Sequence, residues 1–392
     1  MEALDKFMQY TNYVRGLCKV LGMDVLGPNY KRNYRTNVCF VIIGIYVVMS
    51  INSFMLADSS IEMLKAVSFG GFFCQCVLKI YFTLSKSERY HENHTTIKKA
   101  IYLDHLDGNE RQKREILKTV DLLHVVVKGT SLLYFSSVIL FSIYPAYMYF
   151  IVDVKVTIFP LYVPGIDIYS AYGYGFTNSI HLLLSIYGLF GALASDTAFI
   201  MFVFHIYSYT DLLMIKFDEF ADKLGQIEES KDTKQYEAYC RFKMREILLT
   251  HKDIIAYLVS LNNCYQNISS VQVATCSVSI CINLFLALVT DWYATYGFLV
   301  ASVFQLLVFS VLGTIIQLMN DRIIMLIYNL PWHLLPNNEK KSFCFLLFKS
   351  QRPIEILIRG LGPMNVETFT EIMKVIYQAF TMMYSFLIDQ QL

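Results

Sequence analysis

Long apolar segments alternate with polar, charged segments along this chain of 392 residues. A helix that crosses a bilayer needs roughly 20 mostly apolar residues. Six segments meet this requirement: 38–57, 63–84, 122–151, 178–207, 268–290 and 294–319. A seventh segment, 366–389, is apolar but also contains Glu367, Glu371, Lys374 and Asp389. The pattern predicts an all-α polytopic membrane protein with seven transmembrane helices.

Basic residues gather in alternate connecting segments, which predicts the orientation of the chain. Of the 33 lysines and arginines, 28 lie in four segments: 1–37, 85–121, 208–267 and 320–365. The loops between them hold only Lys155. Because Lys/Arg-rich loops stay on the cytosolic side, we expect a cytosolic N-terminus and an extracellular C-terminus. Lys79 lies inside a span, near enough to its end for the ammonium to reach the polar interface.

Composition agrees with a membrane protein and excludes several functions. The chain is 55% hydrophobic, 15% aromatic and only 17% charged, with a net charge of +1, so no nucleic-acid partner is expected. Residues 1–37 form a predicted cytosolic amphipathic arm that contacts membrane lipid, and not a cleaved signal peptide. No phosphate-binding glycine loop or nucleophile motif indicates an enzyme. Cys74 and Cys76 point to different helix faces without a histidine cluster, so neither a metal nor another cofactor is expected.

The last apolar segment has a polar stripe along one side. At 100° per residue, its members fall within about 40° of one line: Glu371, Lys374, Gln378, Met382, Ser385 and Asp389. A polar stripe on a spanning helix must face water or protein, because charged groups in lipid are costly. Two interpretations remain open: polar packing between helices, and a water-filled pathway shared between copies of the helix. In the second, Met382 and neighbouring Phe386 could close a pore by dewetting.

A turn-rich stretch precedes this helix. Gly360, Gly362 and Pro363 interrupt the chain, and Asn365 is a suitable N-cap for the helix that follows. The stretch is either a passive connector or a hinge. Near the helix ends, Asp389 at the outer mouth and Glu367 and Glu371 at the inner mouth would favour cations, whereas Lys374 opposes them.

The C-terminal sequence resembles the signature of the insect odorant receptor family. The resemblance rests on Trp332, on "FLLFKSQRP" and on "GLGPMNVETFTEIMKVIYQAFTMMYSFL". It extends over the whole chain through the seven spans, the cytosolic N-terminus and the long loop after the fourth span. That loop lacks the large insertion of the shared co-receptor, Orco, so the chain resembles a ligand-tuned, divergent subunit. The ending "TMMYSFLIDQQL" departs from the related gustatory receptors, whose last span has Thr-Tyr, five apolar residues, then Gln-Phe.

The resemblance implies an odorant-gated, non-selective cation channel in the plasma membrane of a sensory neuron dendrite. Its subunits would form a heterotetramer with Orco around one pore, opened by a small volatile odorant. The implied organisation has four parts: a cytosolic arm (1–37), spans one to six with a ligand pocket in their outer half (38–319), a cytosolic anchor and connector (320–364), and a pore-lining helix with a short tail (365–392). A short anchor helix would cover residues 338–349.

The same resemblance implies an odorant pocket among spans two, three, four and six. Aromatic, apolar and hydroxyl side chains suit such a pocket, and the candidates are Phe69, Phe72, Phe73, Ser137, Leu140, Tyr144, His181, Ser185, Tyr293 and Tyr296. The aromatic candidates could instead be interfacial anchors or packing residues, and His181 an interface histidine. No buried charge is evident, which favours a neutral ligand. The outer loop 152–177 is either a lid or a membrane-skimming turn, and Asp196 has no assigned role.

Two other functions remain as alternatives. A secondary transporter would also use a polar-striped helix and a central pocket, but transporters commonly have paired broken helices, and the break at 360–363 has no partner in the first half. A related gustatory-type chemoreceptor channel is the other alternative. A G-protein-coupled receptor is disfavoured because its N-terminus lies outside the cell.

Overall fold

The described part of the protein is almost entirely helical. The computed structural model describes the backbone of residues 1–227 and 233–391 and the side chains of residues 1–225 and 234–385. The α-helices are α1 Glu2–Val20, α2 Tyr34–Met55, α3 Ser60–Ser85, α4 Ser87–Ile97, α5 Glu110–Phe150, α6 Ala171–Ile227, α7 Thr233–Val289, α8 Ala294–Tyr328, α9 Asn337–Ser350 and α10 Val366–Gln391. A π-helical segment (Lys98–Leu103) follows α4, and a short 3-10 helix (Trp332–Leu334) precedes α9. The strands β1 Leu357–Ile358 and β2 Gly362–Pro363 pair antiparallel.

Six helices of the described chain are long and apolar enough to cross a membrane: α2, α3, α5, α6, α7 and α8. Each of the first six predicted spans lies within one of these helices, except that three of them run past its C-terminal end by one or two residues. The seventh predicted span coincides with α10, which is not one of the six. Glu371, Lys374 and Gln378 interrupt the apolar sequence of α10. Six membrane-length helices are therefore established, and the seventh crossing stays a prediction.

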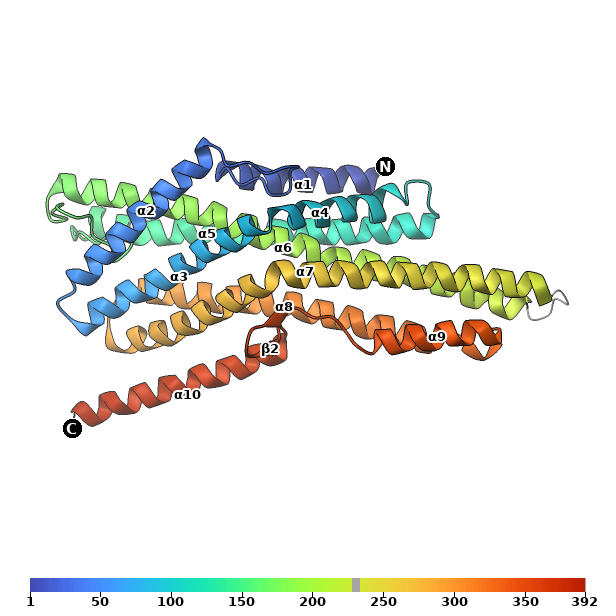
Figure 1. Cartoon of the computed structure of the whole chain (residues 1–392). Helices are drawn as coiled ribbons and strands as arrows, with labels where there is room; N and C mark the ends of the chain where they lie inside the picture. The colour runs from blue at the N-terminus through green and yellow to red at the C-terminus, as the bar shows by residue number, and fades with distance from the viewer. Residues whose placement is uncertain (228–232, 392) are drawn as a thin grey trace.

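Two helices extend well beyond the thickness of a bilayer. Each of α6 and α7 has 57 residues, which at 1.5 Å per residue is about 85 Å. The hydrocarbon core of a membrane is only about 30 Å thick. Figure 1 shows both helices running side by side past the ends of the others, with α9 next to them. The bundle therefore has a second region, formed by the far halves of α6 and α7 together with α9.

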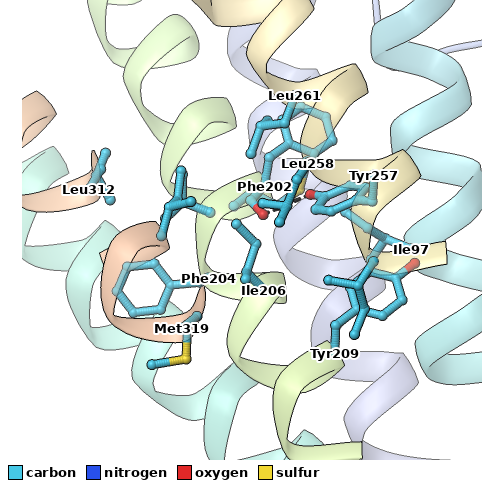
Figure 2. Close-up of a cluster of buried hydrophobic side chains, with 14 of the residues drawn as sticks. Ile97, Phe202, Phe204, Ile206, Tyr209, Tyr257, Leu258, Leu261, Leu312 and Met319 are labelled. Carbon is cyan, nitrogen blue, oxygen red and sulfur yellow. Dashed lines mark hydrogen bonds between the residues drawn. The ribbon is translucent and has the colours of Figure 1, made fainter. Parts of the chain in front are cut away.

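The core of the protein follows α6. From Phe199 to Val203 every side chain of this helix is at most 1% exposed, so the helix is buried on all sides. Figure 2 shows the surrounding side chains from α4, α7 and α8. Tyr257 of α7 donates a hydrogen bond of 2.7 Å to the carbonyl of Phe202. This contact satisfies a hydroxyl that would otherwise be buried without a partner.

The N-terminal arm packs on the bundle. Its helix α1 is amphipathic as predicted, and its apolar side chains Phe7 and Val14 are fully buried, so they face protein instead of lipid. Tyr10 donates to the carbonyl of Thr197 at 2.7 Å, which joins α1 to α6. The turn before α2 requires a glycine: Gly22 has a φ of +73°, and a Cβ there would lie 2.5 Å from the Thr36 nitrogen.

The connector before the last helix is a small β-hairpin. Gly360 and Gly362 adopt φ values of +82° and +105°, which favour glycine. The backbone nitrogen of Leu357 donates to Asn262 at 3.1 Å, and that of Arg359 donates to Ser270 at 2.9 Å, so the hairpin is fixed to α7. The predicted anchor helix, 338–349, lies within α9.

The last helix begins at a cap and then leaves the bundle. Asn365 accepts a hydrogen bond of 2.8 Å from the Thr368 nitrogen, which confirms the predicted N-cap. Ile372 and Ile376 are buried, and this end of α10 contacts α7 and α8. In Figure 1, α10 projects away from the other helices toward the C-terminus. Much of its surface therefore lacks a neighbour in the described part of the chain.

Candidate ligand-binding site

An apolar cavity of about 270 Å³ lies inside the bundle. This volume is close to the lower end, about 300 Å³, of typical small-molecule sites. Side chains of α2, α3, α5, α6 and α8 form most of its lining, together with the turn after α1. Single residues of α1, α4, α7 and the outer loop complete it. The cavity is elongated, since its lining runs along α3 from Phe69 to Thr83, about 21 Å of helix.

One end of the cavity is aromatic. Phe69 and Phe159 lie with ring centres 4.1 Å apart, and Tyr46 stacks on Phe73 at 3.5 Å. Phe298 of α8 lies 4.8 Å from Phe141 of α5. Offset aromatic pairs of this kind pack rigidly while leaving an apolar surface for a ligand. Five of the sequence candidates line the cavity: Phe69, Phe72, Phe73, Ser137 and Ser185.

The other five candidates lie outside the lining. Leu140, Tyr293 and Tyr296 are 66%, 63% and 53% exposed, so they face away from the bundle. Tyr144 lies beyond the cavity, with its ring 6.1 Å from that of Tyr293. Four residues of α5 line the cavity: Tyr134, Ser137, Val138 and Phe141. This face of α5 is rotated away from the predicted one, which ran through Ser137, Leu140 and Tyr144.

His181 is buried and holds the outer loop. Its Nδ1 accepts from the Phe159 nitrogen at 3.4 Å, and its Nε2–H donates to the Leu161 carbonyl at 3.1 Å. Both ring nitrogens are thereby satisfied, so His181 positions the loop and does not contact the cavity. The loop is also bound to α2, because Ser53 accepts from the Tyr162 nitrogen at 2.7 Å. Phe159 is the loop residue that lines the cavity.

A buried ion pair lies at the polar part of the cavity. The Nζ of Lys79 is 3.0 Å from Oδ1 of Asp196, and the two side chains are 4% and 3% exposed. The ammonium also lies 4.9 Å from the ring centre of Phe309, and Tyr134 donates a hydrogen bond to the same carboxylate. Lys79 was expected to reach the polar interface, but its ammonium is buried. No buried charge was expected at the site, but this ion pair is one. Asp196 has a role as the partner of Lys79.

Three glutamines form a hydrogen-bonded cluster beside this pair. Gln75 of α3 donates to Gln272 of α7 at 2.7 Å and to Gln305 of α8 at 2.9 Å. Gln272 also donates to Gln305 at 2.9 Å. Thr275 closes the cluster by donating to Gln75 at 3.0 Å. These bonds connect the cavity wall to two helices that contact α10.

Some lining residues were missed by the sequence analysis. Ile42 and Tyr46 of α2 line the cavity, although the first span was not expected there. Leu21 and Met23, from the turn after α1, line its other end. No sequence signal marked these apolar residues. By contrast, Lys79 and Asp196 had a usable signal, since two opposite charges inside predicted spans are expected to pair.

The candidate pore residues lie on the free part of α10. Gln378, Met382 and Ser385 are all exposed, on the side away from the buried Ile372 and Ile376. The side chains of Phe386 and Asp389 lie outside the described residues. The candidate hinge residues Gly360, Gly362 and Pro363 all belong to the hairpin.

Solved structures with this arrangement are known. The olfactory receptor OR5 from the insect Machilis hrabei superposes with a TM-score of 0.71 over 96% of this chain and 98% of its own, at 12% identity. Its structure in complex with eugenol gives a TM-score of 0.73 over 97% and 99%, at 13% identity. The chain, with its membrane-length helices around an apolar cavity, therefore has the insect olfactory receptor fold.

Sequence comparison gives the family. The model of the family described as 7tm Odorant receptor matches residues 59–377. Odorant receptor 83c of Drosophila melanogaster is 23% identical over 96% of this chain and 97% of its own length. Odorant receptor 10 of Aedes albopictus is 23% identical over 62% and 63%, respectively. The chain belongs to the insect odorant receptor family, which confirms the resemblance; it is a multi-pass membrane protein of olfaction and not an enzyme.

Proposed function

We propose that the chain is the ligand-tuned subunit of an odorant-gated, non-selective cation channel. The cavity binds a small neutral volatile molecule, and α10 lines a pore shared with Orco subunits in a heterotetramer. The observation that carries the proposal is the exposure of Gln378, Met382 and Ser385 on a helix whose apolar Ile372 and Ile376 are buried. Polar residues on a helix at membrane depth need water or protein beside them, and the described part of this chain places no protein over these three.

The proposal includes an orientation in the plasma membrane of a sensory dendrite. The N-terminus, the far ends of α6 and α7, and α9 are cytosolic, whereas the loop 152–170 and the C-terminus are extracellular. In Figure 1 the C-terminus and the loop between α5 and α6 lie toward the same end of the molecule. The basic residues of the N-terminal arm and the anchor segment support this orientation. With α10 as the seventh span, the cavity occupies the membrane region.

A packed route connects the cavity to α10. Phe298 and Gln305 line the cavity from α8. Further along α8, Thr314 accepts a hydrogen bond of 2.9 Å from the Val366 nitrogen, and Gln317 accepts one of 3.2 Å from Asn365. A ligand that displaces α8 would therefore move the first turn of α10. Coupling through contiguous contacts of this kind is how a binding site biases a distant element.

The hairpin acts as the hinge in this proposal. Its positive-φ glycines, Gly360 and Gly362, allow α10 to tilt while the anchor segment 320–364 keeps its contacts. A double Gly360→Ala and Gly362→Ala variant would strain both positions by about 1–2 kcal/mol each. We expect reduced odorant-evoked current at normal surface expression. Unchanged current would show that the hairpin is a passive connector.

The test of the proposed function is whole-cell current during application of a panel of small volatiles. The chain is expressed alone and together with Orco. We expect fast inward current that requires both subunits and no added nucleotide. Silence in both conditions, with the protein detected at the surface, would contradict the proposal and favour a secondary transporter, to be tested by radiolabelled uptake.

A further inference from the structure

The cavity wall is mostly apolar, and its charged and amide side chains gather in one region, called here the polar level. Lys79, Gln75 and Gln305 all line it. Gln75 and Lys79 are one helical turn apart on α3, so they share a face. Gln75 donates to Gln305 at 2.9 Å, and the ammonium of Lys79 lies over Phe309, one turn after Gln305 on α8. The three side chains therefore lie within about one helical turn of one another between α3 and α8.

Hydrogen-bond donors at this level are left unused. A lysine ammonium has three N–H donors, and within the described residues that of Lys79 donates one hydrogen bond, to Asp196. The Gln305 carbonyl oxygen accepts from Gln75 and Gln272, while its amide nitrogen makes no hydrogen bond in the described part of the chain. The Asp196 carboxylate is occupied by Lys79 and Tyr134. The polar level thus offers donors toward the cavity.

The distance from this level to the aromatic end can be taken from two helices independently. Along α3, Gln75 follows Phe69 by six residues, or about 9 Å. Along α8, Gln305 follows Phe298 by seven residues, or about 10 Å. An extended chain advances about 3.5 Å for every three bonds, so this distance corresponds to about eight bonds.

We propose that the cavity binds an elongated, neutral molecule with one oxygen that accepts hydrogen bonds from Lys79 and Gln305. The apolar end of this molecule lies among Phe69, Phe72 and Phe298, about eight bonds from the oxygen. This rests on the proposed function and names the ligand class of the same site. A neutral oxygen is favoured over a carboxylate because Asp196 already balances the charge of Lys79. Ketones, esters and ethers of this length have the required chemistry.

The experiment measures binding and current for one homologous series. The probes are straight-chain methyl ketones from hexan-2-one to tetradecan-2-one, the alkanes of equal length, and the equivalent carboxylic acids. Binding is measured as displacement of tritiated decan-2-one from the full-length protein in lipid nanodiscs. We expect the tightest binding near decan-2-one, whose carbonyl is eight bonds from the chain end. The equivalent alkane and acid should bind at least about tenfold more weakly, the effect of one charge-assisted hydrogen bond.

Variants separate recognition from folding. Lys79→Met alone leaves a buried carboxylate with fewer partners, so the test variant is Lys79→Met with Asp196→Asn, which removes both charges together. The matched control is Arg322→Met with Asp211→Asn, an ion pair of 2.7 Å whose residues do not line the cavity. The test variant keeps only the Gln305 donor, so its preference for ketone over alkane should fall well below that of the wild type, and the control should keep the wild-type ratio.

The outcomes distinguish this inference from the proposed function. Equal binding of ketone and alkane by the wild type, an unchanged ratio in the test variant, or no ketone binding at all would overturn the inference. None of these results would affect the channel proposal if other volatiles still evoke current with Orco. Loss of every volatile-evoked current, despite ketone binding, would contradict the channel proposal and leave the ligand class standing.

Discussion

Two buried polar side chains, His181 and Asp196, each bind partners that hold a larger element in place. His181 joins two backbone positions of the outer loop to α6, and Asp196 joins α3 and α5 to α6 through Lys79 and Tyr134. A buried polar group without a partner costs about 1–3 kcal/mol. Single residues therefore hold the loop and the polar level of the cavity in one arrangement.

His94 of α4 should make the protein less stable in acid. Burial, followed by the nearby charges of His91 and Lys98, lowers the pKa of His94 from 6.5 to about 4. The unfolded chain binds a proton near pH 6.5, but the folded protein does so only near pH 4. The contribution of neutral His94 to the free energy of unfolding is thus fully present above pH 6.5, and it declines as the pH falls from 6.5 to 4.

The measurement is the melting temperature of the detergent-solubilised protein across this pH range. A His94→Gln variant should show a shallower decline than the wild type. His124→Gln, at an exposed position of α5, is the matched control and should keep the wild-type slope. The same slope in all three proteins would contradict the assignment.

At the scale of single residues, the type of side chain in the cavity was easier to predict than the direction in which each side chain points. The aromatic residues of α3 were predicted correctly as apolar lining candidates by type, and Phe69, Phe72 and Phe73 do line the cavity. Leu140 and Tyr296 have equally suitable side chains but face outward. Helical periodicity gives the angle between residues on one helix, whereas the rotation of that helix depends on contacts with helices distant in sequence.

Among the elements, α10 differs from the others because its contacts within the chain are confined to one end. Its first turns lie on α7 and α8, and Met382, further along, is 59% exposed. The contact between the hairpin and α8 is close: a Cβ on Gly313 would lie 1.6 Å from the carbonyl oxygen of Met364. This contact seats the beginning of α10 against the helix that lines the cavity.

A Gly313→Ala variant should weaken coupling between ligand and pore. The added methyl group cannot fit against the Met364 backbone, so the hairpin must move away from α8. We expect loss of most of the odorant-evoked current, measured in whole cells with Orco, while ligand binding in nanodiscs is retained. Gly129→Ala on α5 has nothing within 4 Å of the added atom and should behave as the wild type. Normal current in the Gly313 variant would exclude this route.

A Met382→Ala variant should raise basal leak current. Met382 is the apolar member of the polar stripe on α10, and a shorter side chain at a hydrophobic constriction admits water more readily. The measurement is the ligand-free conductance at matched surface expression. Tyr377→Ala, at an exposed position outside the stripe, is the control. Unchanged leak in the Met382 variant would remove this residue from the gate.

For the whole molecule, the helices could be predicted from the sequence but their assembly could not. The length of the apolar segments located six helices, although α5, α6, α7 and α8 each extend beyond the predicted span. The cavity, however, is closed by side chains from α2, from the turn after α1 and from the loop residue Phe159. Phe159 is far along the chain from the other two segments, and no periodicity within one segment shows which others it meets.

The most direct test of the central claim is a recording from outside-out patches excised from cells that express the chain together with Orco. Volatile ligand is applied to the patch with no nucleotide in the pipette. If the protein is itself part of a ligand-gated channel, discrete openings with a cation-dependent reversal potential should appear at once in the isolated patch. A whole-cell response that disappears on excision, while surface protein remains, would mean that a soluble messenger opens another channel and would contradict a pore formed by α10.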